Sequence, residues 1–172
     1  ELGYVPSLVA GGLASARGRI VAMVIPNISG PIFANTIQGF SDTLSRHGYQ
    51  LLLASSYFSA EQEESAVRAF LGWSPAALVL TSRFHSAGTE KMIADADIPV
   101  VETWDYVPER EPLQIGFSHY EVGVTAARYL HGQGYRRIAF VQNSAAGDFS
   151  AMERGEGFAA TLIELGVQPW AF

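Results

Sequence analysis

The fold is decided by residues 19–55, which read RIVAMVIPNISGPIFANTIQGFSDTLSRHGYQLLLAS. The apolar run at residues 20–25 is rich in β-branched side chains and too short to cross a membrane, so it predicts a parallel strand buried on both faces. Gly-Pro at residues 30–31 opens a helix, because proline fits the first helical turn, and Gly48 ends that helix. A second apolar run at residues 50–54 completes a βαβ unit, for which a right-handed crossover is expected.

Strand and helix patterns alternate through the rest of the chain. Capping-box sequences beginning at Ser59 and Ser118 predict helix starts, and Ser150 is predicted to cap a last helix. Strands are predicted in four further segments: 77–80, 99–101, 115–117 and 138–141, the last of them buried. This alternation predicts an α/β fold with a mainly parallel sheet flanked by helices.

The composition narrows the class of protein. The chain has 172 residues, of which 48% are hydrophobic and 16% charged, enough for a substantial core. A formal net charge of −6 gives no bulk attraction to nucleic acid, and the lack of cysteine excludes disulfide scaffolds and thiolate zinc sites. No export signal or membrane-spanning run is recognisable, so a cytoplasmic location is expected. The first residue is not methionine, so a fragment of a longer protein is expected.

The loops after the predicted strands are the expected ligand site, because ligands of parallel sheets lie beyond the carboxyl ends of the strands. They are six in number: 26–29, 55–58, 81–85, 103–106, 118–120 and 142–149. Hydroxyls, amides and aromatic rings dominate them, which favours a small polyhydroxylated ligand. Arg83 and Arg154 add two-pronged donors for a carboxylate or phosphate, although solvated surface positions are about as consistent with the sequence.

No catalytic motif emerges. Residues 155–160 match a dinucleotide-binding glycine pattern as letters, but they lie inside a predicted helix and not at a strand-to-helix turn. The four histidines lack metal-ligand spacing, and a helix cap explains Ser118 with Glu121 about as well as a role in a site does. Nothing resembles a nucleophile with its base. Neither an enzyme nor a cofactor nor a metal site is therefore expected.

Several segments of the sequence match motifs of a known protein family. Residues 2–7 (LGYVPS), followed by Leu13-Ala14, resemble the hinge of the lactose/galactose-repressor (LacI/GalR) family of bacterial transcription regulators, and residues 26–33 (PNISGPIF) resemble its first effector loop. Further matches at the family's intervals are 48–50, 77–81, 98–101 and 134–139. Segments 80–85, 91–93 and 99–102 look most like the gluconate-operon repressors.

The resemblance implies a periplasmic-binding-protein-like fold of two lobes with an effector between them. The implied parts are a hinge or linker at 1–17, an N-terminal effector-binding lobe at 18–135 and a partial C-terminal lobe at 136–172. It also implies a homodimer and a DNA-binding headpiece before Glu1. In the family the hinge inserts a leucine, here Leu13, into the minor groove of operator DNA, a device that kinks the duplex.

The predicted effector-binding residues combine these motif matches with the strand-end loops. They are Asn27, Ile32, Phe33, Arg83, Trp104, Asp105, His119 and Arg154. By resemblance, Ile32 and Phe33 wall the pocket, and Arg154 lies in an Arg-x-x-Gly-aromatic motif that grips the effector. The chain has Ser118-His119 where the family often has Asp-Asn, which puts a polar effector contact there in question.

The resulting hypothesis is a repressor that responds to a sugar or a sugar acid. Two arginines in the predicted pocket favour an anionic effector such as gluconate. A periplasmic or transport-linked sugar-binding protein would use the same pocket but would have an export signal and no hinge. A sugar-metabolising enzyme on a doubly wound sheet would need a catalytic carboxylate or a phosphate loop, and neither is found.

Overall fold

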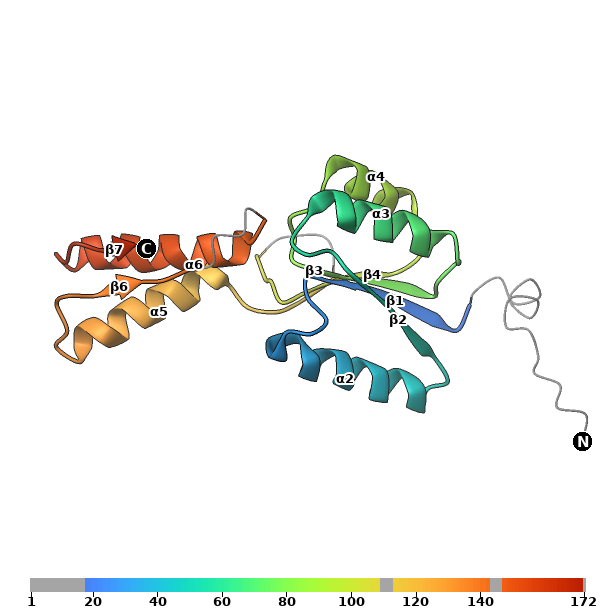
Figure 1. The fold of residues 1–172 in the computed structure, drawn as a ribbon, viewed down its shortest axis with the longest axis horizontal. Helices are drawn as coiled ribbons and strands as arrows, with labels where there is room; N and C mark the ends of the chain where they lie inside the picture. The colour runs from blue at the N-terminus through green and yellow to red at the C-terminus, as the bar shows by residue number, and fades with distance from the viewer. Residues whose placement is uncertain (1–17, 109–112, 143–146, 172) are drawn as a thin grey trace, which may run out of the picture. The chain divides into compact units, whose positions relative to one another are not determined.

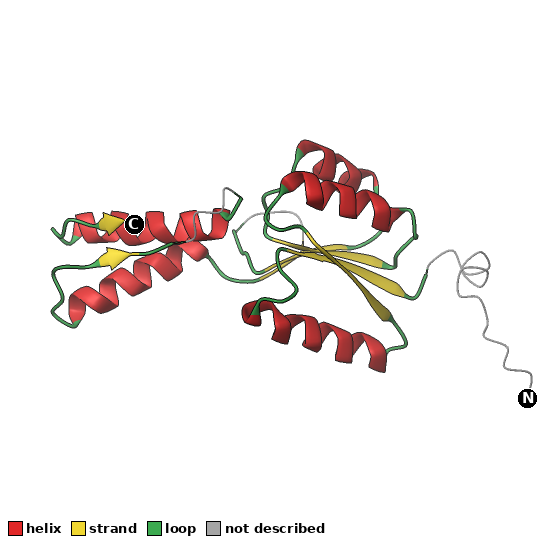
Figure 2. Ribbon diagram, viewed as in Figure 1, coloured by secondary structure: helices red, strands yellow, loops and turns green. Residues whose placement is uncertain are grey.

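The computed structural model describes residues 18–108, 113–142 and 147–171, so the predicted hinge with Leu13 lies outside the described residues. Helices and strands largely alternate along this part of the chain (Figure 2), which confirms the predicted α/β fold. The elements are β1 Ile20–Ile25, α2 Pro31–Arg46, β2 Gln50–Ser55, α3 Ala60–Leu71, β3 Ala77–Thr81, α4 Ala87–Asp95, β4 Val100–Thr103, β5 Leu113–Ile115, α5 His119–Gly132, β6 Ala139–Phe140, α6 Phe149–Glu164 and β7 Trp170–Ala171. No helix in the described part has the length and apolar character of a membrane span.

The described residues form two compact units. The first contains the described residues up to Thr81 together with His85–Glu102, and the second contains Ser82–Phe84 and the described residues from Thr103 onward. The main sheet has the strand order β2-β1-β3-β4-β5. Strand β1 pairs in parallel with both β2 and β3. The predicted βαβ unit is therefore present, with β1 inside the sheet.

Helices cover both faces of the sheet in the first unit, with α2 on one face and α3 and α4 on the other (Figure 1). Alternate residues of β1 face the two layers, as the pleat of a strand requires. Ala22 and Val24 pack in a core cluster with Val67 of α3. Met23 packs on the other face, in a cluster that includes Phe40 of α2. This double cover explains why residues 20–25 form an unbroken apolar run.

Local signals place several element ends where the sequence predicts them. Pro31 is the first residue of α2, and Gly48 follows that helix with a φ of 75°, a backbone conformation that glycine adopts without strain. The hydroxyl of Ser59 accepts a hydrogen bond from the backbone N–H of Gln62, and that of Ser118 accepts one from Glu121, both at 3.2 Å. Both serines are N-caps, as predicted.

The predicted cap of the last helix is wrong. Helix α6 begins at Phe149, and its N-cap is Asp148, whose carboxylate accepts a hydrogen bond from the N–H of Ala151 at 3.0 Å. Aspartate caps as well as serine does, and its negative charge is favoured at a helix N-terminus. The earlier of the two polar residues therefore takes the role, and Ser150 lies within the first helical turn.

The prediction of a buried strand at 138–141 is also wrong. Only Ala139–Phe140 forms a strand, paired in parallel with β7. Ile138 is buried and Phe140 packs against the same cluster, which contains Phe158 of α6. Val141, in contrast, is 77% exposed. Helices cover one side of this short run and leave the other to solvent, so its apolar residues alternate in burial.

Candidate functional site

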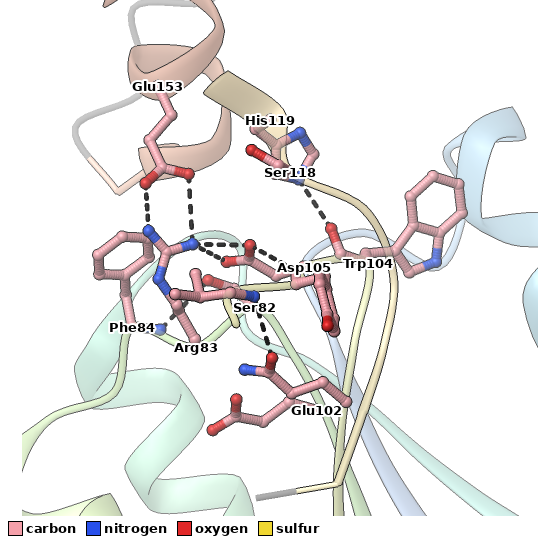
Figure 3. A network of polar contacts seen from close by, with 12 residues as sticks. Ser82, Arg83, Phe84, Glu102, Trp104, Asp105, Ser118, His119 and Glu153 are labelled. Atoms are coloured by element: carbon pink, nitrogen blue, oxygen red, sulfur yellow. Dashed lines mark hydrogen bonds and ion pairs between the residues drawn. The ribbon is translucent and has the colours of Figure 1, made fainter. Parts of the chain in front are cut away.

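Polar side chains from separate parts of the second unit lie close together (Figure 3). Arg83 follows β3, Trp104 and Asp105 follow β4, His119 is the first residue of α5, and Arg154 lies in α6. The backbone at Trp104 adopts the left-handed region with a φ of 65°. The structure thus brings five of the eight predicted effector-binding residues into one unit. We call these residues, together with Glu153, the polar cluster.

Arg83 is held by two carboxylates. Its Nη1 lies 2.6 Å from both Asp105 oxygens and 3.3 Å from Oε2 of Glu153, and its Nη2 pairs with Oε1 of Glu153. The Asp105 side chain is fully buried, whereas those of Arg83 and Glu153 remain 17% and 20% exposed. A buried carboxylate needs such a partner, because an unpaired buried charge is strongly unfavourable.

Aromatic packing helps to hold the guanidinium of Arg83 in position. The Cζ atom lies 4.3 Å from the centroid of the Phe84 ring, a cation–π contact. The Phe84 ring in turn packs 4.7 Å, centroid to centroid, from that of Phe149 at the start of α6. Ser82 donates its backbone N–H to the carbonyl of Thr103 at 2.9 Å. The segment 82–84, which carries Arg83, therefore contacts both the end of β4 and the start of α6.

His119 links Arg154 to the loop after β4. Its Nε2 lies 2.7 Å from the carbonyl oxygen of Trp104, and its Nδ1 lies 2.8 Å from Nη1 of Arg154. A guanidinium only donates and a carbonyl only accepts, so Nδ1 accepts and Nε2 carries the proton. His119 is 4% exposed, and burial, with the nearby Arg154 charge, lowers its pKa below the ordinary 6.5. The imidazole is therefore neutral.

The contacts close into a ring. Arg83 binds Asp105, the neighbouring Trp104 carbonyl binds His119, His119 binds Arg154, and Glu153 beside Arg154 returns to Arg83. The ring contains two arginines and two carboxylates, both of which contact Arg83, so its formal charge is zero with His119 neutral. The sequence identified both arginines as donors for an anion, but it gave no sign that Arg83 already has two anionic partners.

Sequence reasoning missed Glu153. It precedes Arg154 in α6, where a glutamate is indistinguishable by pattern from an ordinary solvated helix residue. Its partner Arg83 lies 70 residues away in sequence. Only the fold brings the two together, so no local signal could have identified this glutamate.

Two glycines let α5 and α6 approach closely and so position His119 and Arg154. A Cβ atom on Gly123 of α5 would overlap the carbonyl oxygen of Arg154 and lie 2.7 Å from the backbone nitrogen of Phe158. A Cβ on Gly157 of α6 would overlap the carbonyl oxygen of Tyr120. The helix backbones thus touch at the level of the polar cluster, a contact open only to residues without a side chain.

The other three predicted effector-binding residues belong to the first unit. Oδ1 of Asn27 accepts hydrogen bonds from the N–H and the hydroxyl of Ser29, at 2.9 and 2.8 Å, which shapes the turn before α2. Ile32 is 66% exposed in the first turn of α2, and Phe33 beside it is partly buried. An exposed isoleucine at a predicted pocket wall is free to contact a ligand.

A second charged cluster in the first unit was not predicted. Nδ1 of His85 lies 2.8 Å from Oε1 of Glu63, and Nε2 lies 3.5 Å from Oε1 of Glu102. Burial acts to lower the pKa of His85, but the hydrogen bonds and charges of Glu102 and Glu63 outweigh it and raise the pKa to about 9. The sequence places this histidine in the strand-end loop 81–85 without metal-ligand spacing, and nothing in it indicates the two glutamate partners.

Comparison with known proteins identifies the family. The sequence model of the family described as periplasmic binding proteins and sugar binding domain of LacI family matches residues 19–171, so this chain belongs to that family. It is 29% identical over 171 residues to the HTH-type transcriptional regulator GntR of Escherichia coli K12, covering 99% of this chain and 51% of that protein. It is 32% identical over 166 residues to the GntR regulator of Pseudomonas aeruginosa, covering 96% and 48%.

The fold has a close counterpart among solved structures. A LacI-family transcriptional regulator from Silicibacter pomeroyi superimposes with a TM-score of 0.91 at 33% identity, covering 99% of this chain and 51% of that one. The chain thus has the periplasmic-binding-protein-like fold expected from the resemblance. It spans about half the length of the curated relatives that it matches.

Proposed function

We propose that this chain is the effector-binding and dimerisation region of a transcription repressor that responds to a sugar or a sugar acid. The polar cluster carries the proposal, since it gathers charged and aromatic side chains in a member of a family described by sugar binding. Relatives named HTH-type transcriptional regulators, about twice as long as this chain, support a DNA-binding part outside it. The proposed protein acts as a cytoplasmic homodimer on operator DNA and performs no reaction on its effector.

Within the cluster, Arg154 is the residue that we assign to the effector. A guanidinium has five N–H donors, and the bond to His119 uses one of them and fixes the orientation of the group. The remaining donors suit sugar hydroxyls or a carboxylate. Trp104 offers a ring for the apolar face of a sugar, and the exposed Ile32 with Phe33 and Asn27 completes the assigned set.

The division of the protein follows the family resemblance. We propose a hinge at 1–17 with Leu13 as its DNA-inserting residue, an N-terminal lobe at 18–135 and the beginning of a second lobe at 136–172. An effector that binds one arrangement of the lobes more tightly shifts the population toward it. That difference in affinity is what changes the affinity for operator DNA.

DNA release by the full-length protein tests this proposal. Fluorescence anisotropy with DNA from upstream of the protein's own gene should report specific binding. D-gluconate should change the affinity of the protein for this DNA by about 5- to 150-fold. The Arg154→Ala variant should bind the same DNA and no longer respond. Arg128→Ala, at an exposed position of α5, is the matched control and should respond as the wild type does. An unchanged response of Arg154→Ala would remove Arg154 from the site.

The family description also includes periplasmic binding proteins, which supports a second candidate. A periplasmic-type sugar-binding protein would bind the same ligand but have no affinity for specific DNA. Ligand binding by full-length protein without any preference for its own upstream DNA over an unrelated sequence would favour this candidate.

A further inference from the structure

We propose that Glu153 is an internal substitute for the carboxylate of an acidic effector, and that such an effector must displace it from Arg83. This inference rests on the proposed function and deepens it. It assigns to Glu153, which lies outside the family motifs matched in the sequence, the setting of affinity for acidic ligands relative to neutral ones.

The geometry of the Arg83–Glu153 pair is that of a bound ligand carboxylate. Both Glu153 oxygens contact the guanidinium, one through Nη1 at 3.3 Å and the other through Nη2. Two-pronged pairing of this kind is how arginine recognises the carboxylates of small ligands. A sugar acid that used Arg83 would therefore require the same edge of the guanidinium that Glu153 holds.

The two carboxylates on Arg83 are not equivalent. Asp105 is fully buried, and its Oδ1 also accepts the N–H of Tyr106 at 2.9 Å, so it is fixed in the structure. The Glu153 side chain is partly exposed, and its hydrogen bonds within the described part of the chain go to Arg83. Glu153 can therefore turn into solvent without leaving a buried group unpaired, which Asp105 cannot do.

The charge of the ring determines how Glu153 affects acidic and neutral ligands. The ring of two arginines and two carboxylates is neutral, so a third carboxylate brought in beside Glu153 would meet a like charge at close range. A neutral polyol brings no such charge and can bind Arg154 with Glu153 in place. Glu153 thus weakens the binding of acids much more than the binding of neutral sugars.

Calorimetry on the full-length protein with two matched ligands tests the inference. D-gluconate and D-glucitol have the same carbon chain but differ in carrying a carboxylate or a hydroxymethyl group. Glu153→Gln keeps the size of the side chain and removes its charge. We expect the variant to bind D-gluconate about tenfold more tightly than the wild type does, because a charge-assisted bond no longer has to be exchanged. Its affinity for D-glucitol should change much less than its affinity for D-gluconate.

Glu156→Gln is the control, since it removes a charge from an exposed position of the same helix and should alter neither affinity. Unchanged or weaker gluconate binding by Glu153→Gln would overturn the inference and leave the proposed function intact. An equal gain for both ligands would also overturn it, because it would show a steric and not an electrostatic effect. If neither ligand binds any variant, the inference fails together with the proposed sugar-type effector. Gluconate binding that appears only in Glu153→Gln would support it most strongly.

Discussion

Nη1 of Arg154 and Nδ1 of His119 lie 2.8 Å apart, and this contact orders one edge of the polar cluster. The arginine comes from the first half of α6, and the histidine is the first residue of α5. Because the opposite nitrogen of the imidazole donates to the Trp104 carbonyl, the ring transmits the position of the loop after β4 to the arginine. His119 is in this respect a positioning residue for Arg154.

The protonation state of His119 follows from these contacts. We expect the neutral Nε2–H tautomer at neutral pH and a pKa below 6.5, since burial and the Arg154 charge lower it. Nitrogen-15 NMR of histidine-labelled full-length protein can measure both, with His119→Gln for assignment. The sign of the linkage is that stability falls as the pH drops below 6.5, where the unfolded chain takes up a proton that the folded one refuses. An Nδ1–H tautomer would contradict the assignment of Arg154 as donor.

The opposite pH dependence is expected for His85. Its pKa is raised to about 9, so it stabilises the fold fully below about pH 6.5, and this contribution is lost as the pH rises from there to about 9. The shift corresponds to at most about 3 kcal/mol. Urea unfolding at about pH 6 and about pH 9.5 should show the loss in wild type and not in His85→Gln. The control His47→Gln, at an exposed helix end, should retain the wild-type dependence.

The close contact of α5 and α6 makes Gly123 sensitive to substitution. Gly123→Ala should lower the free energy of unfolding by about 1–3 kcal/mol or more, because the new methyl group meets the backbone of α6. Gly132→Ala, at the end of the same helix with open space around it, should be neutral or stabilising by about 0.5–1 kcal/mol. Similar effects of the two substitutions in urea unfolding would refute the close contact.

Substitution of Ile32 should affect effector binding without affecting stability. Because it is 66% exposed, Ile32→Ala should change the free energy of unfolding by less than about 0.5 kcal/mol while weakening the effector response of the full-length protein. The same substitution at the fully buried Ile25 should cost about 2–5 kcal/mol. An Ile32→Ala variant with a normal effector response would exclude this residue from the pocket wall.

Much of the fold could be predicted because its signals are local. The apolar run of β1, the proline that opens α2 and the glycine at φ 75° after it are each visible within a few residues. The errors arose where two local signals compete or where burial depends on distant elements. Asp148 and Ser150 are both good caps, and the run at 138–141 does not reveal that helices cover only one of its sides.

The sequence predicted several residues of the candidate site but not the contacts between them. The loops after the strands and the family motifs pointed to Arg83, Asp105 and Arg154, but their pairing depends on the fold. Arg83 meets Asp105 across 22 residues and Glu153 across 70. Charge compensation at such separations leaves no pattern in the sequence, so the neutrality of the cluster and the role of Glu153 required the structure.

The proposed function depends on the binding of a small hydroxylated effector to the polar cluster through Arg154. A crystal structure of the full-length protein grown with D-gluconate tests it most directly. We expect ligand oxygens at about 2.7–3.2 Å from the Arg154 guanidinium, with His119 still bonded to that arginine. A ligand bound elsewhere, with Arg154 contacting only protein atoms, would contradict it.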